Sequence, residues 1–240
     1  MTSTSALSKF PKNLPLLVSR NNPTYLLSND MHNRWQHLMR AFSADAEIAE
    51  ICYRELEQLY TSPNRFYHTF AHIKSLLELI DDYHQELENP HLLQLTAWYH
   101  DAVYDPTRPD NEAKSADLAT RHLLVLNLPE EEITAVNRLV LATALHKLPE
   151  EDDTSDNRFF LDFDLAILGA EPMQYQTYRN QIRQEYSFVP HAAYKQGRQQ
   201  VLRSFLAREL IYLSPQMQQQ YQAQARKNLL RELEELSRQQ

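Results

Sequence analysis

Apolar side chains return every three or four positions along most of the chain, which is the spacing that places them on one face of an α-helix. Trp35, Leu38 and Phe42 form the first such face. Prolines and short polar stretches separate the successive periodic segments, because proline interrupts a helix. The pattern predicts an all-α protein, with helices over about 30–42, 44–59, 67–87, 92–100, 111–126, 129–146, 159–169, 173–186, 191–213 and 215–238.

The same pattern divides the chain into three parts. Residues 1–29 contain three prolines and no clear period, so we expect an irregular arm. Residues 30–213 are expected to form the main helical domain. Residues 214–240 are expected to form a C-terminal helix with one narrow apolar stripe, which can pack on the domain or on a partner, including a second copy in a homodimer.

Glycine is scarce, since only Gly169 and Gly197 occur among 240 residues. Sheets joined by tight turns, and loops that wrap phosphates with backbone amides, usually need several glycines. The composition therefore favours helices and argues against a glycine-rich nucleotide loop. Gly169 ends the predicted helix 159–169 and is expected to be its cap.

Cysteine usage and hydropathy bear on location. Cys52 is the single cysteine and falls in the apolar stripe of segment 44–59, so we expect a buried core residue and no internal disulfide. A reducing, cytoplasmic location fits best. The N-terminal region has no apolar run approaching the about 20 residues needed to cross a bilayer, which favours a soluble protein with no membrane contact.

The formal net charge of -8 opposes broad contact with the phosphate backbone of a nucleic acid polymer. A small phosphorylated substrate is still compatible, because a dication and a few local cations can reverse the potential within a pocket. The cationic residues nearest the polar motifs described below are expected to be ordinary surface charges; they are Arg65, Lys74, Lys114 and Lys147.

Histidines and aspartates interrupt the apolar helices at a few positions. His68 and His72 are one helical turn apart in segment 67–87, and the doublet His100-Asp101 ends the next segment. Asp164 lies inside an apolar helix, where a carboxylate is costly unless it is paired or bound to a metal. Each histidine taken alone is better explained as a hydrogen-bonded, partly buried side chain than as a metal ligand.

Taken together, His72, His100, Asp101 and Asp164 offer two neutral nitrogens and two carboxylates. This mixture suits a divalent metal ion such as Mn, Fe, Co, Ni or Zn and, less comfortably, Mg. The sequence therefore predicts a metal site inside a helical bundle, without identifying the ion.

The order of these residues resembles the HD superfamily of metal-dependent phosphohydrolases, whose signature is a histidine, a His-Asp doublet and a distant aspartate. The resemblance extends over residues 31 to about 213, to a subgroup of predicted HD phosphohydrolases. It implies an all-helical HD fold with the metal at its centre, and it names no substrate. The matching blocks are Tyr67–His72, Trp98–Tyr104, Asp110–Ala116, Ala142–His146 and Leu161–Gly169. Asp164 is preferred to Asp162 as the ligand because the following Leu-Ala is similar to the family's block and Asp162 should point away.

Four residues are expected to have further roles, and for three of them (His68, Glu112 and His146) an alternative stays open. Asp101 would hold the metal and orient a water. His68 would protonate the leaving oxygen, as a similar histidine does in the related cyclic nucleotide phosphodiesterases, or would only support a metal-ligating residue or lie at the surface. Glu112 would accept a proton or support a metal-ligating side chain, or would only interact favourably with the helix dipole. His146 would be an extra ligand, a phosphate contact or a histidine stabilised at a helix C-terminus.

These expectations describe a hydrolase for a small phosphate ester, such as a nucleotide or related metabolite. One alternative is an HD-fold module that binds a nucleotide or other ligand without consuming it. Another is a di-iron oxygenase, which would need more ligands, and His68 and His146 are the candidates.

Overall fold

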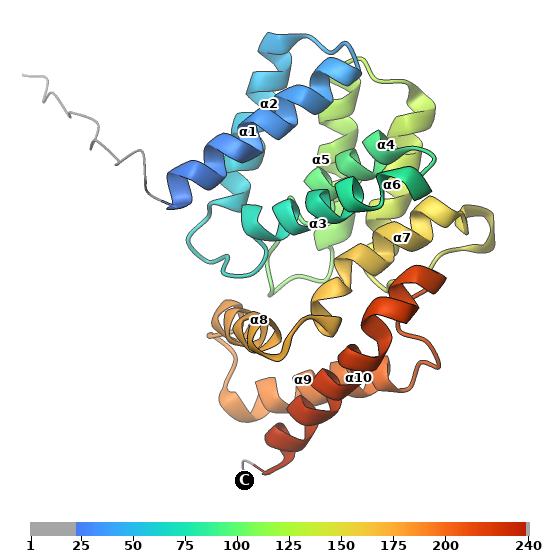
Figure 1. Cartoon of the computed structure of the whole chain (residues 1–240). Helices are drawn as coiled ribbons and strands as arrows, with labels where there is room; N and C mark the ends of the chain where they lie inside the picture. The colour runs from blue at the N-terminus through green and yellow to red at the C-terminus, as the bar shows by residue number, and fades with distance from the viewer. Residues whose placement is uncertain (1–22, 239–240) are drawn as a thin grey trace, which may run out of the picture.

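The computed structural model describes residues 23–238. Within this range the chain forms ten α-helices, three short 3-10 helices and no strand, so the predicted all-α class is confirmed (Figure 1). The α-helices are α1 (Pro23–Ala41), α2 (Ala46–Tyr60), α3 (Phe70–Asp82), α4 (Pro90–Tyr99), α5 (Asn111–Val125), α6 (Glu130–Thr143), α7 (Ser155–Asp164), α8 (Pro172–Glu185), α9 (His191–Leu206) and α10 (Pro215–Arg238). The 3-10 helices are η1 (His84–Glu86), η2 (Glu150–Asp152) and η3 (Ala166–Gly169).

Helices α1 to α6 gather in one part of the molecule and α8 to α10 in another, with α7 and η3 leading from one to the other (Figure 1). Helix α4 is the centre of the larger part, because it contacts α1, α3, α5, α6 and α7. No helix in residues 23–238 combines the length and apolar character that a membrane crossing requires.

An aromatic cluster surrounds α4 and fixes where that helix ends. Trp98 is fully buried, and its ring lies edge-on to Trp35 and Phe70 at centroid distances of 5.3 and 5.9 Å. The hydroxyl of Tyr60 donates a hydrogen bond of 3.0 Å to the carbonyl of Trp98. Since Trp98 is two residues before His100, this packing positions the His-Asp doublet.

Cys52 belongs to the same core, as predicted. Its side chain is buried, and burial raises the pKa of the thiol to about 11. A thiol with so high a pKa is a packing residue rather than a nucleophile at neutral pH.

Several helix starts differ from the sequence prediction, including that of α7, which begins at Ser155 instead of 159, and two of them change the expected arm and the expected site. Helix α1 begins at Pro23, inside the stretch expected to be irregular, and residues 1–22 of that expected arm lie outside the described residues. Helix α3 begins at Phe70, because the Thr69 hydroxyl accepts a hydrogen bond from the amide of Ala71 and caps the helix. His68 therefore precedes α3 instead of sharing its face with His72.

The predicted glycine cap at residue 169 is wrong. The α-helix ends at Asp164, and Gly169 closes η3 without a positive φ. A Cβ atom at this position would lie 2.7 Å from the Cβ of Tyr221 in α10. Glycine is needed here because the backbone of α10 comes so close.

The C-terminal helix packs on the rest of the chain rather than standing apart, since α10 lies against α9 and η3. Its start is held by Asp162, whose buried carboxylate accepts hydrogen bonds from the amides of Leu213 and Ser214. Further along, Glu232 of α10 pairs with Arg198 of α9 at 2.9 Å. The described part of the chain thus has α10 as an integral helix.

Candidate metal centre

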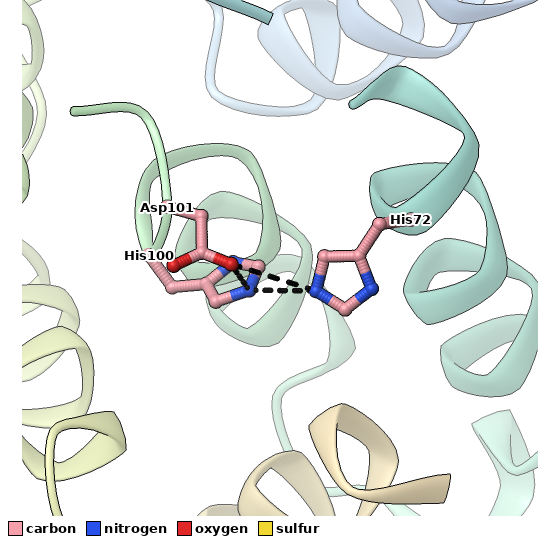
Figure 2. A group of neighbouring side chains, drawn as sticks. All are labelled: His72, His100 and Asp101. Atoms are coloured by element: carbon pink, nitrogen blue, oxygen red, sulfur yellow. Dashed lines mark hydrogen bonds and ion pairs between the residues drawn. The ribbon is translucent and has the colours of Figure 1, made fainter. Parts of the chain in front are cut away.

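Three helix ends bring the predicted ligands together. His72 lies in the first turn of α3, and His100 and Asp101 directly follow the last residue of α4. Figure 2 shows the imidazole of His72 pointing across a short gap toward His100 and Asp101. The ligating atoms of these three residues all lie within 4.8 Å of one another, so the group can hold a metal ion.

Asp164, the last residue of α7, adjoins this group. Its Oδ1 lies 3.2 Å from Nε2 of His72 and 3.6 Å from Nε2 of His100. The fold therefore brings all four predicted ligands to one place. Asp162 faces away toward Ser214, as expected from its position two residues earlier in the same helix.

The hydrogen bonding of His100 indicates which of its two ring nitrogens is free to bind a cation. Nδ1 of His100 lies 3.0 Å from the carbonyl oxygen of Ala97, and a carbonyl can only accept, so Nδ1 carries the proton. A neutral His100 then presents the lone pair of Nε2, which is 3.1 Å from Nε2 of His72. Two imidazole nitrogens this close need a proton or a cation between them.

The pKa shifts within the cluster also favour a positive charge at this place. Burial alone would raise the pKa of Asp164, but hydrogen bonds from His100, His146 and His72 hold it well below its usual range. Burial lowers the pKa of His72, whereas the neighbouring carboxylates, foremost Asp101, outweigh burial and raise the pKa of His100 well above its usual value. The cluster is therefore built to hold positive charge between two carboxylates.

His146 also reaches the cluster, although it lies beyond the end of α6. Its Nε2 is 2.8 Å from Oδ2 of Asp164, and its backbone adopts a φ of 48°. A positive φ is uncommon for a residue with a side chain and costs about 1 kcal/mol or more. The ring of His146 thus contacts a predicted ligand, and its roles as an extra ligand, a phosphate contact or a histidine at a helix terminus stay predictions.

His68 stands beside the cluster on the loop before α3. Its ring stacks on Tyr104 at a centroid distance of 4.1 Å, and its Nε2 lies 3.9 Å from Oδ2 of Asp101. Burial opposes a charge on His68, but Asp101 and Glu185 outweigh it and raise the pKa of this imidazole. His68 thus faces the predicted ligands from outside the helix that was expected to carry it.

Glu185, the last residue of α8, holds His68 in place and was not predicted. Its Oε2 lies 2.7 Å from Nδ1 of His68, while Oε1 accepts hydrogen bonds from the amides of Phe66, Tyr67 and His68. Burial alone would raise the pKa of Glu185, but these hydrogen bonds, foremost that from His68, lower it to about 2. Glu185 comes 117 positions after His68, and no local pattern marks it.

Arg65 is not the surface charge that the sequence suggested. It is buried, and its guanidinium donates hydrogen bonds to the carbonyls of His68, Asp101 and Ala102. Five donors in a rigid fork suit such a role, because they tie the two loops of the site together. Lys74 pairs with Asp30 at the surface, and Lys114 and Lys147 are exposed, as expected.

A cavity of about 910 Å³ opens on the cluster. One side is lined by His68, Asp101, His146 and Asp164, and the other by residues of α8 and α9. Glu112, in the first turn of α5, is half-buried and lines the same cavity, so both of its predicted roles are compatible with its position.

Comparisons of the chain with models of protein families, with curated proteins and with solved structures find no match. Function is therefore inferred from the residues of the site and from the cavity beside them.

Proposed function

We propose that the chain is a metal-dependent phosphohydrolase of the HD type, acting on a small phosphate ester such as a nucleotide or related metabolite. The observation that carries this proposal is the convergence of His72, His100, Asp101 and Asp164 beside a cavity of about 910 Å³. The order of these residues along the chain is the order of the HD signature, which supports the superfamily assignment.

The donor set fits a divalent ion. Two imidazoles with facing Nε2 atoms and two carboxylates of depressed pKa are ligands suited to Mn, Fe, Co, Ni or Zn and, less well, Mg. When bound there, such an ion would acidify a water molecule and polarise a phosphoryl oxygen.

Protein side chains orient the water, donate the proton and hold the ligands in place. Asp101 has its Oδ2 3.0 Å from His100 and 3.9 Å from His68, so it is placed to orient a water between the ligands and the proton donor. His68 is the proton donor for the leaving oxygen, since its Nδ1 is held by Glu185 and its Nε2 faces the cluster. His146 orients Asp164, and Glu112 is a candidate proton acceptor at the cavity wall.

The test is phosphate release from a panel of phosphate esters with and without added Mn²⁺. We expect release that depends on Mn²⁺ in the unchanged chain and is lost in His100→Ala and Asp101→Asn. His37→Ala and Asp117→Ala change the same residue types at exposed positions and serve as matched controls that keep activity. Circular dichroism confirms that each variant is folded.

Two outcomes would indicate a different function. Saturable ligand binding without a product would indicate a binding module. Oxygen uptake together with two irons per chain would indicate an oxygenase. Full Mn²⁺-dependent turnover in Asp101→Asn would show that these residues do not form the active site.

A further inference from the structure

The cavity extends well beyond the candidate metal centre, along α8 and α9. Its far wall is largely aromatic or aliphatic and consists of Tyr178, Ile182, Tyr186, Tyr194, Val201 and Phe205. Val201 is 44% exposed although it is apolar. Apolar side chains that stay accessible beside a polar centre are typical of a ligand-binding wall.

Gly197 lies on this wall in the interior of α9, where glycine weakens a helix. Its φ is not positive, and a Cβ atom added there would meet nothing within 4 Å. Neither the backbone nor packing requires glycine at this position, in contrast to Gly169. The missing side chain leaves open space inside the cavity.

The cationic side chains of the cavity are already paired. In the described part of the chain, the guanidinium groups that line it are those of Arg108 and Arg198. Arg108 makes two hydrogen bonds to Asp110, at 2.8 and 2.7 Å, and Arg198 makes two to Glu232, at 2.9 and 3.1 Å. A second anionic group of a ligand would have to compete with these carboxylates, whereas an apolar group would not.

We infer that the cavity beside α9 receives an apolar, ring-bearing organic group of the phosphate ester, and that Gly197 is the residue that leaves room for it. This inference rests on the proposed function, since the phosphoryl group is placed at the metal centre. It names the substrate class: an ester whose organic part is bulky and uncharged, not a small anionic metabolite.

The test uses phosphonates, which are not hydrolysed, so that binding is measured without turnover. In the full chain with Mn²⁺, calorimetry gives the Kd of 1-naphthylmethylphosphonate, of methylphosphonate and of 3-phosphonopropionate. We expect the naphthyl compound to bind at least tenfold more tightly than the other two. Gly197→Leu should raise the Kd of the naphthyl compound at least tenfold and change the Kd of methylphosphonate by less than twofold.

Gln196→Leu is the matched control, because it places the same side chain at the neighbouring exposed position outside the cavity. It should leave all three affinities unchanged. Leucine favours a helix more than glycine does, so Gly197→Leu should not lower the melting temperature.

Equal affinity of the unchanged chain for the three phosphonates would overturn the inference, as would an unchanged naphthyl affinity in Gly197→Leu. A change of oligomeric state in Gly197→Leu without a change in affinity would assign this face to a second copy and would also overturn it. Failure of the proposed function is a separate result, namely no Mn²⁺-dependent phosphate release from any ester.

Discussion

Two buried polar clusters in this protein differ in whether their charges are matched. Between α8, α9 and α10, the carboxylate of Glu232 accepts hydrogen bonds from Arg198 and from the hydroxyl of Tyr175. At the candidate metal centre, by contrast, the Nε2 atoms of His72 and His100 face each other at 3.1 Å. A matched cluster joins helices by itself, whereas two imidazole nitrogens that face each other leave a position that a cation can occupy.

The pKa directions express the same difference. Burial alone would raise the pKa of Glu232, but Arg198 outweighs it and lowers that pKa. In the centre, the pKa of His72 is lowered and that of His100 is raised, although both are buried imidazoles of one cluster. The raised pKa of His100 and the lowered pKa of Asp164 both show that positive charge is favoured between the carboxylates of this cluster.

The largest effect on stability is expected from breaking the matched cluster. Glu232→Ala leaves Arg198 buried without its carboxylate, so the free energy of unfolding should fall by about 3–5 kcal/mol. Denaturant titration measures this value. Glu234→Ala, which removes an exposed pair with Arg238 in the same helix, is the control and should change stability by less than about 1 kcal/mol. Equal effects of the two variants would contradict the comparison.

The metal centre should gain stability from a cation, which the matched cluster does not need. Mn²⁺ at about 100 times its Kd should stabilise the chain by about 2.7 kcal/mol. His72→Leu should abolish this gain, yet lower the metal-free stability by no more than about 1.5 kcal/mol, because His72 is neutral and loses one hydrogen bond. Unfolding with and without Mn²⁺ provides the measurement. A Mn²⁺ gain that survives in His72→Leu would exclude this residue as a ligand.

Glu185 connects the two parts of the molecule and should affect activity. Glu185→Gln keeps the shape but removes the charge beside His68, so kcat/KM should fall by about ten- to a hundredfold. The pH optimum of kcat/KM should also move to lower pH, because Glu185 is one of the groups that raise the pKa of His68 and the variant lacks its charge. A pH profile of kcat/KM distinguishes this role from simple loss of structure, which would lower activity equally at every pH.

The matched pair also predicts a pH dependence of stability. The pKa of Glu232 is lowered in the folded chain, so its contribution is fully present above the unfolded value of about 4.3 and is lost as pH falls through the folded pKa. Glu232→Gln should therefore flatten the decline in stability below about pH 4.3. Thermal unfolding from pH 7 to pH 3 tests this, and parallel curves for the two proteins would contradict it.

The smallest effect concerns the cavity wall. Gly197→Ala should raise the free energy of unfolding by about 0.8–1 kcal/mol, since alanine is the better helix residue and nothing lies within 4 Å of the new Cβ atom. Denaturant titration measures the gain. A loss of stability would show that glycine serves the fold and not the cavity.

Local spacing within the sequence predicted the all-α class and most of the helices, although the starts of α1, α3 and α7 differ from the prediction. The apolar period is repeated within each helix, and a His-Asp doublet that ends a buried segment must lie at the edge of the core. The expectation for His72, His100, Asp101 and Asp164 came from their residue types and places in the helices together with the resemblance to the HD signature, and the structure brings these side chains close together. Asp162 was expected to point away because it lies two residues before Asp164 in the same helix.

Only the tertiary structure decided the residues that act across the fold. Glu185 meets His68 because α8 packs beside the loop before α3, and Arg65 is buried because two loops close over it. Gly169 is required by α10, which the chain reaches only later. Such contacts join segments far apart in sequence, and they depend on packing between helices, which a short window of residues does not encode.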